Sequence, residues 1–306
     1  MLVVRVDPRA DEGWFYEGGG IYRHVWLRST ATPAHIAPWG VYVPSEVDAG
    51  SVQRLASGAV IGSAKVMIMT DLDGLVAGIG HTGAGSKQQR RLRMVGDAGS
   101  DYVVQSNISD HEGNLVWYGS VAVAAGSNST TQVAQLSEAT LWMPGKPGPC
   151  GWPGSCQPGV PAAMYSVTTT LKMFATGNPV DSEVTRFGIR SLTFDPDRGL
   201  LVNGFAVKAK GMCNHQDFAG VGTAVPDRVQ AFRVAQMQAY GVNAWRTAHN
   251  PPNPELLDAL DDAGVLVMNE NRNFGNHSTW LADFAAMLKR DRNHPSVVWW
   301  SVRIST

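Results

Sequence analysis

The pattern of hydrophobic and polar positions changes at about Phe187. From Trp39 up to that point, short apolar stretches alternate with polar positions and are separated by clusters of Gly, Asn and Asp. A period of two predicts strands such as Ala64–Met69 and Tyr165–Met173, and Asp110–Asn114 reads as a hairpin loop. Short strands at this spacing, with almost no helical period, predict an antiparallel β-sandwich of immunoglobulin type.

After Phe187, strand-like and helix-like stretches alternate. Continuously apolar strands between helices predict a parallel sheet covered by helices, and four such strands amount to about half of a (β/α)8 TIM barrel. The predicted strands are 207–211, 243–247, 265–268 and 297–301. The first predicted helix begins at Pro226, with Val229, Phe232 and Met237 among its apolar positions. The second runs from the N-cap Asn253 to the stop at Gly264, with an apolar stripe of Leu256, Leu257 and Leu260. The third spans 278–290, with Leu281, Phe284 and Leu288 on one face.

The first residues contain two strand-like stretches, Leu2–Val6 and Ile21–Leu27, around a turn at Gly18–Gly20. Two strands do not form an independent domain. They are either the last strands of a sheet whose earlier strands are missing, or a hairpin packed on the next domain.

Charge and cysteine content narrow the function classes. With 25 Lys+Arg against 26 Asp+Glu, the net charge of −1 provides no basic field, so neither nucleic acid nor an anionic membrane is an expected partner.

No apolar stretch is long enough for a spanning helix or a signal peptide, which leaves the localisation open. Three cysteines are too few for a disulfide framework, and Cys150 and Cys156 are either a local disulfide or two free thiols.

Polar side chains follow three successive predicted strands of the barrel part. Reactive groups of such barrels stand at the C-terminal strand ends, so this clustering predicts an active-site face. Individually, each residue also has a structural explanation, for example an internal Arg246–Glu270 pair. No H-x-x-x-H or C-x-x-C spacing is present, so no metal or cofactor is predicted. The candidate site residues are His215, Arg246, His249, Asn250 and Glu270.

Four ordered motifs of this part resemble the barrel start of family 2 glycoside hydrolases, especially bacterial β-galactosidases. They are Gly211–Asp217, Val225–Arg228, Gly241–Pro252 and Asp291–Val297. Upstream, Trp14–Leu27 resembles the last strands of that family's jelly-roll sugar-binding domain, and Leu141–Pro144 with Met164–Tyr165 the end of its immunoglobulin-like domain. The resemblance implies incomplete jelly-roll strands at 1–38, an immunoglobulin-like sandwich at 39–186 and the first half of a TIM barrel at 187–306.

The resemblance also implies roles for individual residues. His215 and His249 match residues that bind sugar hydroxyls, and Arg246 matches one that orients the catalytic carboxylates, with Asn250 beside it. Glu270 lies where the family usually has Asp-Glu, but Asn269 replaces the Asp. A Glu-x-His magnesium pair is not evident, so the resemblance does not support a magnesium requirement.

Both catalytic carboxylates are expected to be absent. Retaining glycosidases need a nucleophile and an acid/base. Where the family has Asn-Glu after the fourth strand, this sequence has Ile304 and Ser305, and the nucleophile would lie beyond residue 306. We therefore expect the chain to be encoded by a fragment of a longer gene and to be inactive alone. The complete enzyme is expected to hydrolyse terminal β-galactosides. The alternatives are a β-glucuronidase, a β-mannosidase or a non-enzymatic module that binds glycans or proteins, and the oligomeric state stays open.

Overall fold

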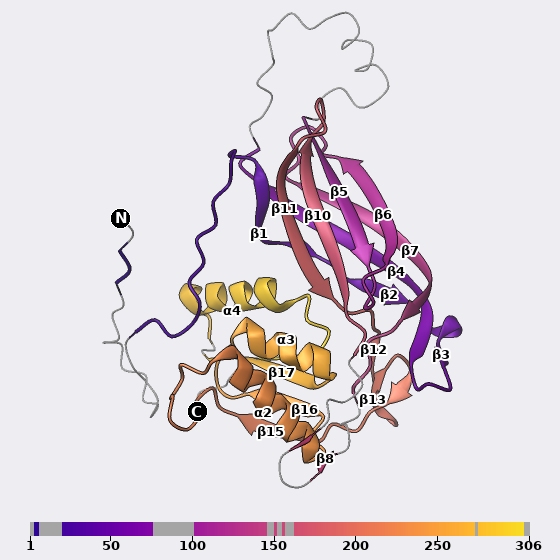
Figure 1. Cartoon of the computed structure of the whole chain (residues 1–306), viewed down its shortest axis with the longest axis vertical. Helices are drawn as coiled ribbons and strands as arrows, with labels where there is room; N and C mark the ends of the chain where they lie inside the picture. Colours follow the sequence, from indigo (N-terminus) through magenta and orange to yellow (C-terminus); the bar gives the residue numbers. More distant parts are fainter. Residues whose placement is uncertain are drawn as a thin grey trace, which may run out of the picture.

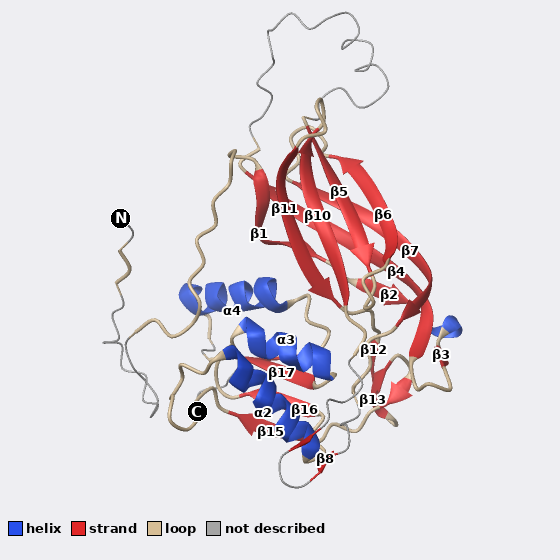
Figure 2. Ribbon diagram, viewed as in Figure 1, coloured by secondary structure: helices blue, strands red, loops and turns tan. Residues whose placement is uncertain are grey.

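The chain folds into a β-sandwich and a smaller unit of parallel strands and helices (Figure 1). The computed structural model describes residues 3–5, 20–75, 101–145, 150–151, 155–156, 162–272 and 275–302. Figure 2 shows that the long helices belong to the smaller unit, whereas the sandwich consists of strands, loops and one short helical turn beside β3. In the described ranges, no helix has both the length and the apolar character needed to cross a membrane.

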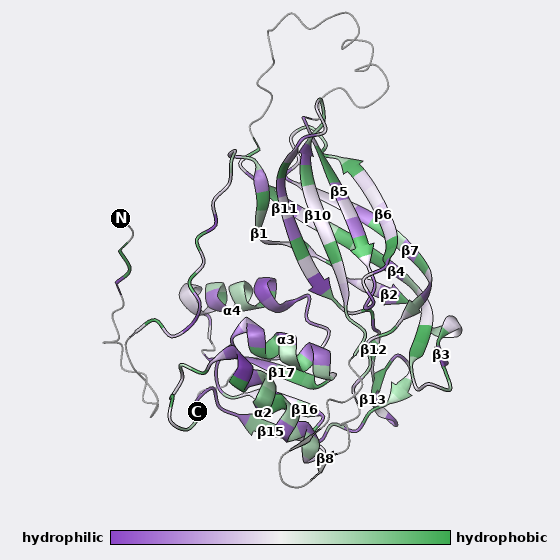
Figure 3. Ribbon diagram, viewed as in Figure 1, coloured by the Kyte–Doolittle hydropathy of each residue, from purple (hydrophilic) through white to green (hydrophobic). Residues whose placement is uncertain are grey.

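The sandwich has two antiparallel sheets. In one, β4 pairs with β1, β2, β3 and β7, and the other has the order β11-β10-β5-β6. Along β4, buried residues alternate with more exposed ones from Val60, as the sequence period predicts. Figure 3 shows both apolar and polar residues along the strands of the sandwich. The strands are β1 (His35–Tyr42), β2 (Ser45–Val47), β3 (Gln53–Arg54), β4 (Val60–Asp73), β5 (Tyr102–Ser109), β6 (Leu115–Ala122), β7 (Ser129–Thr140), β10 (Tyr165–Met173) and β11 (Pro179–Phe187), with a 3-10 turn η1 at Ala49–Ser51.

The smaller unit contains a parallel sheet of order β15-β16-β17-β18. Among the described residues this sheet is open and does not close into a barrel. Its elements are β15 (Gly211–Asn214), α2 (Asp227–Ala239), β16 (Ala244–Thr247), α3 (Pro254–Ala263), β17 (Leu266–Asn271), α4 (Ser278–Asp291) and β18 (Val297–Val302). A small antiparallel sheet of β12 (Leu192–Asp195), β13 (Gly199–Val202) and β14 (Phe205–Ala206) precedes it.

Helix α3 follows its sequence signals closely. It begins after Asn253 and ends at Gly264, which has φ 65° and ψ 43°. The predicted stripe Leu256, Leu257 and Leu260 is buried in a cluster with residues of β16, β17 and β18. Local capping and an apolar stripe therefore determine this element.

The predicted apolar positions of α2 are confirmed only in part. Met237 packs against the core, but Phe232 is 52% exposed, and the buried residues of the helix are Gln230, Val234 and Gln238. The two glutamines are satisfied by hydrogen bonds at either end of α3, because Gln230 Nε2 donates to Asn253 Oδ1 (3.2 Å) and Gln238 Nε2 donates to the Ala263 carbonyl (2.7 Å). Paired amides therefore supplement the apolar contacts of Val234 and Met237 with the cluster that contains the α3 leucines.

Two further elements differ from prediction. In α4, Leu281 is exposed, whereas Met287 and Asp291 are buried. The predicted strand at 207–211 forms instead at Gly211–Asn214, because its partner β16 begins opposite Gly211 at Ala244. Parallel pairing thus decides where this strand begins.

The described N-terminal segment does not form the predicted strand at 21–27. Residues 20–34 have no strand partner, and the first strand of the sandwich begins at His35, four residues before the predicted boundary at 39. In Figure 1 the segment descends from β1 beside the helical unit. Of the other predicted strand, Leu2–Val6, residues 3–5 are described and are not in a strand, whereas of the turn at 18–20 only Gly20 is described.

Hydrogen bonds and packing join the sandwich to the helical unit. Trp142 Nε1 donates to the Asp261 carbonyl in α3 (2.9 Å). The buried Arg190 donates to the carbonyls of Pro295 (2.5 Å) and Val297 (2.8 Å), and its burial lowers the pKa of the guanidinium to about 10. Buried donors that are paired in this way fix one part of the molecule against the other.

The Cys150 and Cys156 prediction stays open. Their backbones pair in a short hairpin of β8 (Cys150–Gly151) and β9 (Ser155–Cys156), but their side chains lie outside the described part.

Candidate active site

A charged group stands at the C-terminal ends of β16 and β17. Arg246 Nε donates to Glu270 Oε2 (2.6 Å), and Arg246 Nη2 donates to Glu270 Oε1 (2.9 Å). The Glu270 side chain is fully buried, whereas that of Arg246 is 33% exposed. The hydrogen bond from Arg246 to Glu270 raises the pKa of the guanidinium, so the arginine is held charged in a bidentate pair.

The two candidate histidines join this group. His249 Nδ1 lies 2.9 Å from Glu270 Oε1 and 3.2 Å from Arg246 Nη2. The His215 ring packs edge-on against the His249 ring, with centroids 5.1 Å apart and an interplanar angle of 86°. From α2, Arg233 Nη2 donates to the His215 carbonyl (2.5 Å), which fixes the loop that carries this histidine. The structure thus brings His215, Arg246, His249 and Glu270 together.

Asn250 occupies the same loop but contacts a different partner. Its Oδ1 accepts a hydrogen bond from Arg272 Nη1 (3.3 Å), which connects the loops after β16 and β17. The fifth candidate therefore borders the Arg246 group.

Three supporting residues were not among the candidates. The Glu270 backbone N–H donates to Thr247 Oγ1 (2.9 Å), Ser301 Oγ donates to Glu270 Oε2 (3.4 Å), and Arg246 Nη1 donates to Cys213 Sγ (3.4 Å). All three residues lie in or near the ends of the parallel strands, which is the sequence signal that would have identified them.

Asn269, where the sequence resemblance expects an Asp, is not part of this group. Its fully buried amide donates to Asp291 Oδ2 in α4 (2.8 Å), and Arg290 Nε also donates to Asp291 (2.5 Å). Successive residues of a strand point to opposite faces, so Asn269 serves the helix contact while Glu270 serves the site.

A cavity of about 460 Å3 lies between the N-terminal segment and the beginnings of α2 and α3, and Gln216, which follows His215, is part of its lining. The segment is held there by Arg23, whose Nη2 donates to Gln216 Oε1 (3.1 Å) and to the Pro251 carbonyl (2.7 Å). A separation of about two hundred residues hides this contact from sequence periodicity.

The arrangement presents N–H donors and one fixed carboxylate at the strand ends. A guanidinium and imidazoles suit a ligand rich in hydroxyl groups, because each hydroxyl both accepts and donates hydrogen bonds. No group of three metal-ligating side chains is found at this position within the described ranges.

Residues 196–283 match the TIM barrel domain of glycosyl hydrolases family 2. The chain belongs to glycoside hydrolase family 2.

Relatives of this chain are named for two activities. It is 29% identical to a beta-galactosidase of Bacteroides ovatus over 99% of this chain and 32% of the relative. It is 30% identical to a beta-glucuronidase of Mus musculus over 66% of this chain and 31% of the relative. A solved family 2 member from Bacteroides cellulosilyticus superposes with a TM-score of 0.70 at 27% identity, over 97% of this chain and 35% of that structure. The chain thus spans about a third of the length of these proteins.

Proposed function

We propose that the chain carries part of the sugar-binding site of a retaining glycosidase that acts on terminal β-galactosides. The observation that supports this best is the convergence of Arg246, His249 and Glu270 at adjoining strand ends, with His215 packed against them. The similarity to a beta-galactosidase over 99% of the chain favours the galactoside.

In this proposal, His215 and His249 bind sugar hydroxyls, Asn250 borders the sugar, and Arg246 orients the carboxylates of the reaction. Glu270 is a positioning residue. Both of its oxygens are engaged by Arg246 and one also by His249, and its side chain is fully buried, so it is poorly placed to attack an anomeric carbon or to protonate an aglycone.

We further propose that the 306-residue chain alone binds sugar without hydrolysing it. Retaining catalysis needs two carboxyl groups about 5 to 5.5 Å apart. Glu270 is already held by its partners, and Ser305 stands where the resemblance expects the acid/base. No metal or cofactor is included in this proposal.

The domain assignment is proposed on the same basis. Residues 1–38 are assigned to jelly-roll strands, 39–186 to an immunoglobulin-like sandwich and 187–306 to the first half of the barrel. The antiparallel pairing of β5, β10 and β11 and the parallel order of β15 to β18 support the second and third assignments.

Calorimetric titration with β-galactosides, β-glucuronides and β-mannosides tests the substrate class. We expect galactoside binding to be the strongest, and to be lost in His249→Gln but kept in His111→Gln, a control in an exposed hairpin of the sandwich. Preference for the glucuronide or mannoside would assign the chain to those activities instead. Binding unaffected by His249→Gln would place the sugar elsewhere and favour a binding module.

A chromogenic β-galactoside assay tests the catalytic part separately. We expect the chromophore to be released no faster than it is in buffer without protein. Turnover that copurifies with the 306-residue chain would refute the proposed lack of a competent carboxyl pair.

A further inference from the structure

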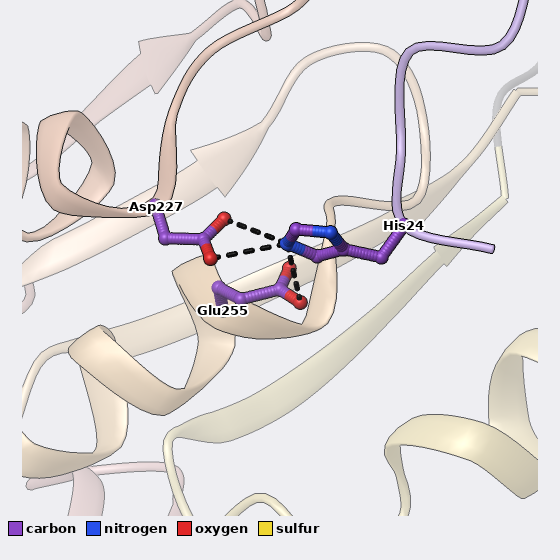
Figure 4. Close-up of side chains that lie close together, drawn as sticks. All are labelled: His24, Asp227 and Glu255. Atoms are coloured by element: carbon purple, nitrogen blue, oxygen red, sulfur yellow. Dashed lines mark hydrogen bonds and ion pairs between the residues drawn. The ribbon is translucent and has the colours of Figure 1, made fainter. Parts of the chain in front are cut away.

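A second cluster of ionisable side chains lies at the cavity between the N-terminal segment and the beginnings of α2 and α3. His24 Nε2 is 3.1 Å from Asp227 Oδ2, 3.2 Å from Asp227 Oδ1 and 3.8 Å from Glu255 Oε1. Figure 4 shows both carboxylates directed at the same ring nitrogen. The three residues come from the N-terminal segment and from the first turns of α2 and α3, so three separate parts of the chain converge on one point.

The contact between His24 and Asp227 is by itself an ordinary hydrogen-bonded pair, in which Nε2 faces both oxygens of one carboxylate. Glu255 Oε1 approaches the same nitrogen from a second helix, so three carboxylate oxygens gather around one imidazole nitrogen. Imidazole and carboxylate groups are the ligand types that bind first-row divalent cations in proteins.

The spacing also suits a first-row divalent ion. Metal bonds of about 2.0 to 2.2 Å place neighbouring ligand atoms about 2.8 to 3.6 Å apart at octahedral or tetrahedral angles. The two distances from His24 Nε2 to the Asp227 oxygens, 3.1 and 3.2 Å, lie in that range, and the distance to Glu255 Oε1, 3.8 Å, is longer. One ligand atom from each residue falls within 4.8 Å of the others. Shifts of a few tenths of an ångström in exposed side chains would complete the set.

The surroundings allow further ligands. All three residues line the cavity of about 460 Å3, which has room for water molecules at the remaining coordination positions. The side chains of His24 and Asp227 are about half exposed, so an ion can enter from solvent. The positive ends of α2 and α3 oppose a cation, and we therefore expect weaker binding than in a closed structural site.

We propose that His24, Asp227 and Glu255 form a binding site for a divalent transition-metal ion of the zinc type. The imidazole nitrogen selects such an ion over Mg2+ or Ca2+, which prefer oxygen ligands. The bound ion fastens the N-terminal segment to the helical unit, next to the Arg23 contacts with Gln216 and the Pro251 carbonyl. The site is separate from the proposed sugar-binding group and does not depend on its function.

Titration of the metal-free chain with Zn2+, followed by calorimetry, tests the site. We expect one equivalent to bind, and binding at this site to be lost in His24→Gln and in Asp227→Asn. His277→Gln is the matched control, because His277 is also an exposed histidine beside a helix start and lies outside the cluster. Circular dichroism of each variant verifies the fold, which exposed substitutions should leave intact.

Two further measurements identify the ligands and the consequence. Co2+ in place of Zn2+ should give visible absorption bands that disappear in His24→Gln, and Zn2+ should slow proteolysis within residues 20–34 of the wild type only. Absence of binding by Zn2+ and Co2+ would overturn the proposal. So would one-equivalent binding that persists in both His24→Gln and Asp227→Asn, since the ion would then occupy another site such as the Asp258, Asp261 and His294 group.

Discussion

At the scale of single residues, the buried Glu270 carboxylate organises the strand-end group. It accepts both hydrogen bonds of the Arg246 fork and lies within hydrogen-bond distance of His249. The bidentate geometry matters more than charge alone, because it fixes the plane of the guanidinium. In the sequence analysis, an Arg246–Glu270 pair was a structural explanation of these residues. In the structure, the pair also contacts His249.

Glu270→Gln is expected to destabilise the chain and weaken sugar binding. The neutral amide leaves the Arg246 guanidinium without its counter-charge. We expect the free energy of unfolding to fall by about 2 to 4 kcal/mol, and by an amount near the lower value because Arg246 is partly exposed to water. Urea denaturation measures the change. As a control, Lys65→Gln removes an exposed pair with Glu46 and should cost no more than about 1 kcal/mol. Equal effects of the two substitutions would contradict the prediction.

Asn269→Asp places a second carboxylate against Asp291 in the core. In the wild type, the Asn269 amide donates to Asp291 Oδ2 at 2.8 Å. An aspartate at this position would either repel the Asp291 carboxylate or have to be protonated to donate to it. We expect a loss of about 2 to 4 kcal/mol in the free energy of unfolding at pH 7 and a smaller loss at pH 5. Asn128→Asp, at an exposed position, should change the stability by no more than about 0.5 kcal/mol. A pH-independent loss would show that charge is not the cause.

At the scale of elements, helix ends and strand pairing have different origins. The end of α3 at Gly264 follows from local backbone chemistry, and its burial follows from a stripe of three leucines. The start of β15 depends on its neighbour β16, and the buried face of α2 depends on amide contacts with α3. Sequence patterns therefore predicted α3 well and the face of α2 only in part.

Gly264→Ala and Gly241→Ala form a matched pair at the ends of α3 and α2. Both glycines have positive φ, 65° and 82°. A Cβ at Gly241 meets no atom within 4 Å, whereas one at Gly264 would overlap the Gly145 backbone nitrogen and lie 2.8 Å from the Met143 carbonyl. We expect Gly241→Ala to cost about 1 kcal/mol and Gly264→Ala clearly more, because backbone must move. Thermal denaturation compares them, and a Gly264→Ala cost no larger than that of Gly241→Ala would contradict the argument.

At the scale of the whole molecule, contacts around Asp261 connect the sandwich, α3 and the loop before β18. The Asp261 carbonyl accepts from Trp142, and its carboxylate accepts from the Ser296 backbone N–H (3.1 Å) and lies 2.6 Å from His294 Nδ1. These residues are far apart in sequence and neither hydropathy nor spacing indicates that they meet. Burial of the shared carboxylate makes the junction sensitive to the charge of His294.

The stability of this junction should depend on pH. Burial lowers the pKa of His294, but the carboxylates of Asp261, Asp291 and Asp258 oppose this and leave the pKa raised. A raised histidine pKa gives stability that is fully present below the unfolded value of about 6.5 and is lost as the pH rises through the folded pKa. We expect the free energy of unfolding to fall over that range in the wild type and to fall less in His294→Gln. His111→Gln should keep the wild-type slope, and an unchanged slope in His294→Gln would refute the assignment.

The sequence by itself determined the class of the elements, the antiparallel and parallel halves, the α3 boundaries and the strand-end position of His215, Arg246, His249, Asn250 and Glu270. These depend on local periodicity, capping and the rule that parallel strands end at one edge. Only the tertiary structure decided that residues 20–34 run along the helical unit without a strand partner, that Asn269 serves Asp291, and that His24 meets Asp227 and Glu255. The physical reason is that hydrogen bonds and ion pairs between distant segments depend on how the elements pack, and periodicity along the chain carries no record of that packing.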